Sequence, residues 1–145
     1  MKKIFALTLA LMLALSLFTV VSSANEYIDR SDWTYTASSE MDGWGFIDRA
    51  FDGDSKTFWH TKYIAEGSTI THKDPLPHTI EITLPKTTAI SGIAYLPRQD
   101  HQSGHLTTYE VYISSTGTDK GELAATVNIE NTAAMDEVVT KFKKS

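Results

Sequence analysis

Residues 109–114 read Tyr-Glu-Val-Tyr-Ile-Ser, so Tyr109, Val111 and Ile113 fall on one side of an extended chain. A period of two residues is typical of a β-strand with one buried face. Clusters of Gly, Pro, Asp, Asn and Ser separate this stretch from the other apolar runs. Comparable strand signals recur in four further stretches: residues 33–36, 80–84, 90–96 and 125–129. Short strands at this spacing predict an all-β sandwich.

Two segments do not fit the strand pattern. Residues 41–46 read Met-Asp-Gly-Trp-Gly-Phe and are interpreted as a loop, with Trp44 between two glycines. In the segment 133–142, the spacing of Met135, Val138 and Phe142 is helical, so periodicity alone predicts a helix there.

The first 24 residues have the pattern of a secretory signal peptide. Lys2 and Lys3 precede an apolar run from residue 4 to residue 21, and Ser22-Ser23-Ala24 supplies small residues before a cleavage point. The run is also long enough for a membrane anchor, which needs roughly 20 apolar residues. The small residues and the polar sequence that follows favour cleavage. We therefore expect a secreted, extracellular protein whose single domain is residues 25–145.

Composition excludes some classes of partner. The chain of 145 residues has a net charge of −5 and no basic stripe, which argues against nucleic acid. It contains no cysteine, so neither a disulfide nor a lipidated cysteine is available. The missing cysteine favours a bacterial source. No serine-hydrolase, zinc-protease or phosphate-loop signature is present, so an enzyme is not indicated.

Residues 49–57 read Arg-Ala-Phe-Asp-Gly-Asp-Ser-Lys-Thr and form the densest polar cluster. Asp52, Asp54 and the hydroxyl of Thr57 could converge on a hard cation such as calcium. This is not an EF-hand loop, because Tyr63 stands where that loop needs a glutamate. The alternative is a simple turn in which both carboxylates bond their own backbone.

Two further motifs suggest recognition of a sugar. Residues 58–63 read Phe-Trp-His-Thr-Lys-Tyr and set His60 beside flat rings, which can stack on a sugar while polar groups bond its hydroxyls. Arg98 follows a predicted strand at a turn stiffened by Pro97, and its planar fork could bond two adjacent hydroxyls. The alternatives are that Trp59 belongs to the core, that His60 is an ordinary surface residue and that Arg98 forms a surface salt bridge.

Taken in order, these motifs resemble the factor 5/8 type C, or discoidin, domain, and most of all its bacterial branch, the family-32 carbohydrate-binding modules. The resemblance covers about residues 31–142. It is carried by residues 37–40 (Ala-Ser-Ser-Glu), 50–57 (Ala-Phe-Asp-Gly-Asp-Ser-Lys-Thr), 58–61 (Phe-Trp-His-Thr), 77–80 (Pro-His-Thr-Ile), 95–99 (Tyr-Leu-Pro-Arg-Gln) and 109–114.

The resemblance implies a jelly-roll β-sandwich of the galactose-binding type, with a shallow sugar site in loops at one end. His60 would bond the sugar, Tyr63 would stack on it, and Arg98 would bond hydroxyls. Glu40 is the nearest match to a glutamate that sometimes joins them. Ser103 stands where the family often has an asparagine. Members are usually attached to glycoside hydrolases and often bind galactose-type sugars.

The resemblance also implies a structural calcium ion. Its ligands would be the side chains of Asp52 and Thr57 and the backbone carbonyls of Arg49, Asp54 and Thr57. The family continues with a strand carrying an Arg-Tyr pair and a last strand carrying an Ala-Glu pair, and this chain reads to Ser145 without either. We therefore expect a sandwich without its last strands and a weakened calcium site. The family pattern makes residues 138–142 a strand, against the helical periodicity.

The sequence thus predicts a secreted, non-catalytic module that binds galactose-type glycans. Two alternatives remain open. One is a membrane or cell-surface adhesion module that binds phospholipid or protein and uses Trp44 as an apolar spike. The other is a fragment of a larger secreted glycoside hydrolase.

Overall fold

The computed structural model describes residues 26–131, 133 and 135–143, so the expected signal peptide lies outside the described residues. Within these ranges the regular structure consists of strands and one short 3-10 turn, η1 (Ile47–Ala50). The strands are β1 (Thr34–Ala37), β2 (Tyr63–Glu66), β3 (Thr69–Lys73), β4 (Ile80–Thr83), β5 (Gly92–Tyr95), β6 (Thr108–Ile113), β7 (Glu122–Asn128) and β8 (Val138–Lys141). The all-β prediction is confirmed, and each of the five predicted stretches contains a strand.

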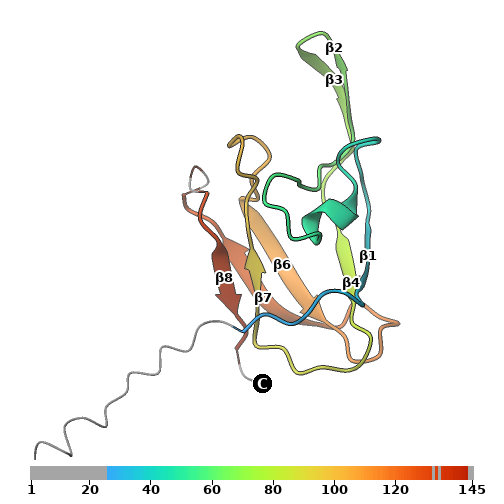
Figure 1. Cartoon of the computed structure of the whole chain (residues 1–145), viewed down its shortest axis with the longest axis vertical. Coiled ribbons are helices and arrows are strands. Elements are labelled where there is room, and N and C mark those ends of the chain that lie inside the picture. The colour runs from blue at the N-terminus through green and yellow to red at the C-terminus, as the bar shows by residue number, and fades with distance from the viewer. Residues whose placement is uncertain (1–25, 132, 134, 144–145) are drawn as a thin grey trace, which may run out of the picture.

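The strands form antiparallel pairs, of which two join neighbours in sequence and two join distant segments. β2 pairs with β3 and β6 with β7, whereas β1 pairs with β4 and β5 with β8. In Figure 1 the β1–β4, β5–β8 and β6–β7 pairs form the body of the molecule. The β2–β3 hairpin, which the sequence analysis did not predict, extends away from the body at one end.

Residues 138–141 form a strand, so the helix predicted from periodicity is wrong and the family pattern is right. Val138 lies opposite Tyr95 and Val139 opposite Ala94 in the β5–β8 ladder. Along β8, half-buried residues alternate with exposed ones, which is a period of two. A partner strand some 45 positions earlier supplies the backbone hydrogen bonds, and β-branched valines suit that extended chain.

Two tyrosines connect the strand pairs to one another. The rings of Tyr95 and Tyr109 meet at 6.2 Å in an edge-on geometry. The Tyr109 hydroxyl lies 3.0 Å from that of Thr140, so one contact group joins β5, β6 and β8. Burial raises the pKa of Tyr95, whose hydroxyl accepts the N–H of Leu106 at 3.0 Å.

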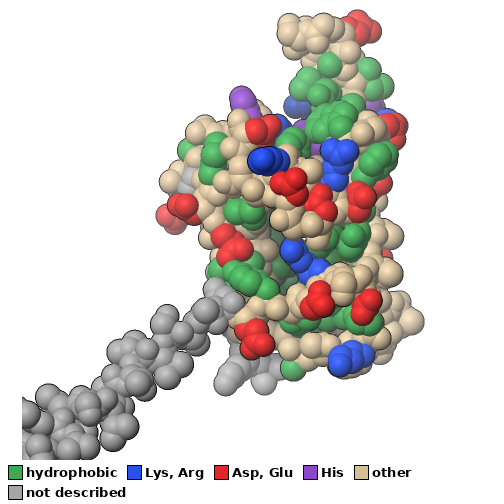
Figure 2. All heavy atoms as spheres, in the orientation of Figure 1, with side chains coloured by type: hydrophobic (Ala, Val, Ile, Leu, Met, Phe, Trp, Pro, Cys, Tyr) green, Lys and Arg blue, Asp and Glu red, His purple; other side chains and the backbone are tan. Residues whose placement is uncertain are grey.

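The aliphatic core of the described residues is thin. Among the aliphatic and aromatic side chains of the described ranges, Ile47 alone is classed as buried, with 7% of its surface exposed. Ile80 and Ile82 were expected to form the buried face of a strand, yet they are 39% and 36% exposed. On the face shown in Figure 2, apolar side chains reach the surface among interspersed acidic and basic ones.

A network of polar contacts connects segments of the fold and centres on Ser39, which is only 6% exposed. The Ser39 hydroxyl donates to Asp74 Oδ2 at 2.6 Å and accepts the backbone N–H of Lys62 at 2.9 Å. The Ser39 carbonyl accepts the indole N–H of Trp59 at 2.9 Å. Three segments far apart in sequence therefore meet at one small side chain.

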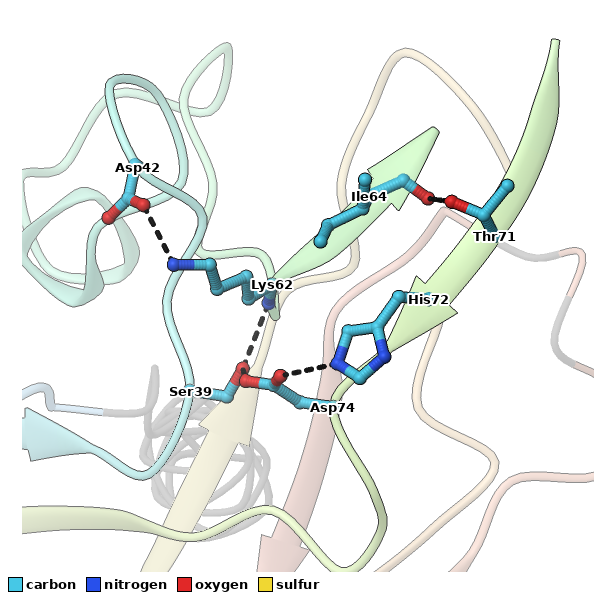
Figure 3. A network of polar contacts seen from close by, with 7 residues as sticks. All are labelled: Ser39, Asp42, Lys62, Ile64, Thr71, His72 and Asp74. Carbon is cyan, nitrogen blue, oxygen red and sulfur yellow. Dashed lines mark hydrogen bonds and ion pairs between the residues drawn. The ribbon is translucent and has the colours of Figure 1, made fainter. Parts of the chain in front are cut away.

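Figure 3 shows how this network reaches the base of the hairpin. Asp74 lies 3.7 Å from His72 on β3, and the Lys62 ammonium donates to Asp42 at 2.9 Å. The hydrogen bond raises the pKa of Lys62, in the direction expected for a paired ammonium. The network thus holds the loop after β1, the start of β2 and the end of β3 together.

Replacing Ser39 by alanine should lower the free energy of unfolding by about 1–3 kcal/mol, because it leaves the Lys62 N–H without its acceptor in a half-buried position. Urea unfolding followed by tyrosine and tryptophan fluorescence measures this change. Ser55→Ala, at an exposed position in the 52–57 loop, is the matched control and should stay within about 0.5 kcal/mol of the parent. Equal stability of the two variants would contradict the structural role of Ser39.

Candidate functional site

Four aromatic rings gather where the hairpin leaves the body of the molecule. His60 is central, with its ring centroid 5.1 Å from that of Trp44, 5.3 Å from that of Tyr63 and 6.5 Å from that of Phe58. Trp44 also meets Phe58 at 5.9 Å and Tyr63 at 6.4 Å, both edge-on. All four side chains are partly exposed, so the group forms a surface rather than an interior.

Backbone contacts hold this aromatic group in place. The N–H of Met41 donates to the carbonyl of His60 at 2.8 Å, and the N–H of His60 donates to the carbonyl of Gly45 at 3.1 Å. Tyr63 is the first residue of β2, so the hairpin fixes its position. The 41–45 loop and the start of β2 therefore define the geometry of the rings.

One ring nitrogen of His60 is engaged and the other faces a glycine. Nδ1 lies 2.6 Å from the carbonyl of Thr61, which can only accept, so in the neutral ring Nδ1 carries the proton. Nε2 is then an acceptor. A Cβ on Gly104 would stand 4.0 Å from Nε2, so the glycine leaves space beside this nitrogen.

Arg98 is held from two directions. Its Nε and Nη2 atoms each donate to Asp100 at 2.7 Å, and its guanidinium carbon lies 3.9 Å from the centre of the Phe58 ring. The side chain of Arg98 is only 18% exposed. The salt-bridge alternative for Arg98 is therefore present, but the same guanidinium also stacks on the aromatic group and keeps the hydrogens of Nη1 for another acceptor.

The ion pair between Arg98 and Asp100 shifts both pKa values. The hydrogen bond from Arg98 lowers the pKa of Asp100 to about 2, and the bond to Asp100 raises the pKa of Arg98.

The other two candidates are Ser103 and Glu40, and Ser103 lies in the loop that passes beside His60. It precedes Gly104, the residue beside His60 Nε2, and its own N–H donates to His101 Nδ1 at 2.9 Å. The carboxylate of Glu40 accepts the N–H of Ile47 at 2.7 Å and so stabilises the start of η1. The contacts of Glu40 therefore give it a role in shaping the loop.

The candidate metal loop brings oxygen atoms together around Thr57. Its hydroxyl lies 2.6 Å from Asp52 Oδ2, 3.0 Å from the carbonyl of Asp54 and 3.3 Å from the carbonyl of Arg49. One hydroxyl has one proton, so it can satisfy only one of these three acceptors fully. Such a group of oxygens is the kind of donor set that calcium takes.

The simple-turn alternative for this loop is also visible. Asp52 accepts the N–H of Asp54 at 2.8 Å, and Asp54 accepts the N–H of Lys56 at 2.9 Å. The second carboxylate oxygen of Asp52 is the one that points at Thr57. Within the described ranges, no cluster of three or more His, Cys, Asp or Glu side chains is arranged for a metal, so any ligand set here includes carbonyls and a hydroxyl.

Trp44 is the residue of the aromatic group that sequence reasoning left out. The sequence suggested a solvent-exposed spike, whereas the structure packs the indole against three other rings. The two flanking glycines are the sequence feature that could have indicated this packing, because glycine permits a close approach between two segments.

The ionisation of Asp100 should depend on Arg98. In an NMR titration of the side-chain carboxyl, Asp100 should titrate near pH 2, and Arg98→Gln should return its pKa toward the ordinary value of 3.8. Because the folded pKa is depressed, the stabilising contribution of this pair is complete above the ordinary value and is lost as the pH falls through about 2. Lys62→Met, which removes a different ion pair, is the control and should leave Asp100 unchanged. An unchanged pKa in Arg98→Gln would refute the pairing.

No helix of the described residues is long and apolar enough to cross a membrane.

Relatives of this chain among curated proteins include three enzymes that are much longer than it is. Galactose oxidase of Gibberella zeae is 41% identical over 100 residues, which is 68% of this chain and 14% of that protein. An A type blood N-acetyl-alpha-D-galactosamine deacetylase of Flavonifractor plautii is 32% identical over 95 residues, covering 64% of this chain and 11% of that protein. A sialidase of Micromonospora viridifaciens is 34% identical over 74 residues, covering 51% and 11%.

The chain therefore spans only a small part of each of these relatives. The F5/8 type C domain family matches residues 34–145, which include all eight strands and both candidate sites. That family has a galactose-binding-like β-sandwich fold, and its domain is a binding module that fits carbohydrate recognition. By this match over most of its length, the chain belongs to the F5/8 type C domain family.

Proposed function

We propose that this domain binds galactose-terminated glycans outside the cell and has no catalytic activity of its own. The observation that carries the proposal is one partly exposed aromatic surface, on which His60 contacts the rings of Tyr63 and Phe58 while Arg98 stacks on Phe58. The names of two relatives, a galactose oxidase and an N-acetyl-alpha-D-galactosamine deacetylase, support the choice of galactose-type sugars.

The chemistry of the surface complements that of a pyranose. A sugar ring presents hydroxyls at its edge and C–H groups on its face. His60 offers an acceptor at Nε2, and Arg98 keeps donors at Nη1, so a pair of hydroxyls can donate to one residue and accept from the other. The Tyr63 ring offers a flat apolar surface for the C–H face.

Two observations support a binding module rather than an enzyme. The carboxylate that lies beside the surface, Asp100, is tied to Arg98 by two short hydrogen bonds and kept ionised, so it is a poor proton donor. In the relatives the matched region is at most 14% of the protein, which leaves the greater part of each for other domains.

We propose two further features from the sequence pattern and the loop geometry. The apolar run of residues 4–21 and the small residues before Asn25 support export with cleavage after Ala24. The oxygens around Thr57 support a structural calcium ion held by Asp52 and Thr57 through side chains and by Arg49 and Asp54 through carbonyls.

Removing the side chain of His60 or of Arg98 should weaken sugar binding strongly. With one stacking ring and two polar residues, the parent should bind methyl β-galactoside near the millimolar range, about −4 kcal/mol. His60→Ala and Arg98→Ala should each weaken binding more than tenfold in an NMR titration while the domain stays folded. Arg30→Ala, an arginine near Gly53 in the metal loop, is the control and should bind as the parent does. Parent-like binding by both site variants would place the sugar elsewhere.

Calcium should stabilise the domain only modestly. Four oxygens converge at the loop, those of Arg49 O, Asp52 Oδ2, Asp54 O and Thr57 Oγ1, and calcium prefers six to eight. Water must complete the shell, so affinity is limited and the stabilisation grows only with the logarithm of the calcium concentration. Calorimetry should show a small rise in Tm in millimolar calcium over chelator, and none in Asp52→Asn. A large rise in micromolar calcium would show a more complete site.

A further inference from the structure

Trp44 occupies a place in the aromatic group that the proposed contacts of His60, Tyr63 and Arg98 do not use. Its indole touches the rings of Phe58, His60 and Tyr63, yet it is only partly buried. Trp44 thus presents part of its surface to solvent directly beside His60 and Tyr63, two candidate sugar contacts. A ring so placed is available to a bound glycan.

The two glycines that flank Trp44 make this position possible. Gly43 has a φ of +85°, a conformation that other residues rarely adopt, and it turns the chain at the tip of the loop. A Cβ on Gly45 would lie 2.8 Å from the Cβ of Met41 and 2.9 Å from that of His60. Only a residue without a side chain lets the loop lie this close to His60.

The loop is also fastened on both sides of Trp44. Gly45 accepts the N–H of His60, and Met41 donates to the carbonyl of the same residue. Asp42, on the same side of Trp44 as Met41, also forms an ion pair with Lys62 at 2.9 Å. The indole is thus held before any ligand arrives, which lowers the entropic cost of using it in binding.

The angles between the rings indicate what Trp44 can contact. Its plane stands at 72° to that of Tyr63 and at 54° to that of His60. A pyranose that lies flat on Tyr63 cannot also lie flat on a ring inclined so steeply. The indole therefore forms a second wall, available to the sugar unit that is linked to the first.

We propose that Trp44 contacts the second sugar of a galactose-terminated glycan and makes the domain prefer a disaccharide to a monosaccharide. This inference rests on the proposed function, because it places the first sugar on His60, Tyr63 and Arg98. The ligand class is an oligosaccharide with a terminal galactose, such as a β-galactosyl disaccharide.

A membrane-inserting role fits the same residue less well. An apolar spike needs a free tip, whereas this indole is packed against three rings.

The test compares the affinities of the mature domain for methyl β-galactoside and lactose by calorimetry or NMR titration. The parent should bind lactose more tightly, and Trp44→Ala should reduce the ratio of the two affinities to near one, a loss of about three- to tenfold in the preference. Trp44→Phe keeps a flat ring and should retain part of it. Trp33→Phe, which alters an indole packed on Phe51, is the matched control and should keep the full preference.

The outcomes separate the two proposals. If the parent binds neither sugar, the proposed function fails and this inference fails with it. If the parent binds both sugars equally, or if Trp44→Ala weakens both by the same factor, the first proposal stands and the assignment of Trp44 is overturned. Co-sedimentation with phosphatidylserine vesicles that is lost in Trp44→Ala, with an unchanged sugar ratio, would assign the indole to lipid instead.

Discussion

Residues 41–45 dock onto His60 through both of its backbone polar groups, and the arrangement of the candidate site follows from this contact. The docking sets the indole of Trp44 against the imidazole and fixes the ring that supplies the acceptor. Ser39, buried two residues before the loop, anchors it to the start of β2 and to Asp74. Ser39 and Gly45 thus determine the positions of much larger rings, because each of these small residues allows two backbone segments to approach closely.

Electrostatic pairing defines the opposite side of the same surface. Arg98 has a bidentate partner in Asp100 and a flat neighbour in Phe58, so its guanidinium has little freedom left. Because Asp100 is largely exposed, the pair contributes little to folding stability, and its main effect is on orientation. A guanidinium that is already held in place loses less conformational entropy on binding a hydroxyl than a mobile one does. This difference matters for a shallow site with few contacts.

Directional contacts join the segments of the scaffold beneath the site. Tyr95 and Tyr109 join three strands, and the Ser39 network joins three further segments, while Ile80 and Ile82 stay partly exposed. Hydrogen bonds and ring contacts are specific in geometry but individually modest in free energy. The loops can therefore be well positioned on a body whose apolar burial is limited.

The sequence by itself determined the features that depend on neighbours in the chain. Alternation along residues 109–114 predicted a strand, and the Asp52 and Asp54 turn was foreseeable because each carboxylate bonds an N–H two residues on. His60, Tyr63 and Arg98 could be singled out as candidates from motifs and family resemblance.

Only the tertiary structure decided the features that depend on distant partners. The tail became a strand because β5 offered it a hydrogen-bonding edge, which outweighed its helical spacing. Trp44 joined the aromatic group because Gly45 met His60, and the exposure of Ile80 and Ile82 depends on what packs against β4. A local sequence pattern can predict local conformation. Burial and ring contacts arise between segments that are far apart in sequence, so no short stretch of sequence predicts them.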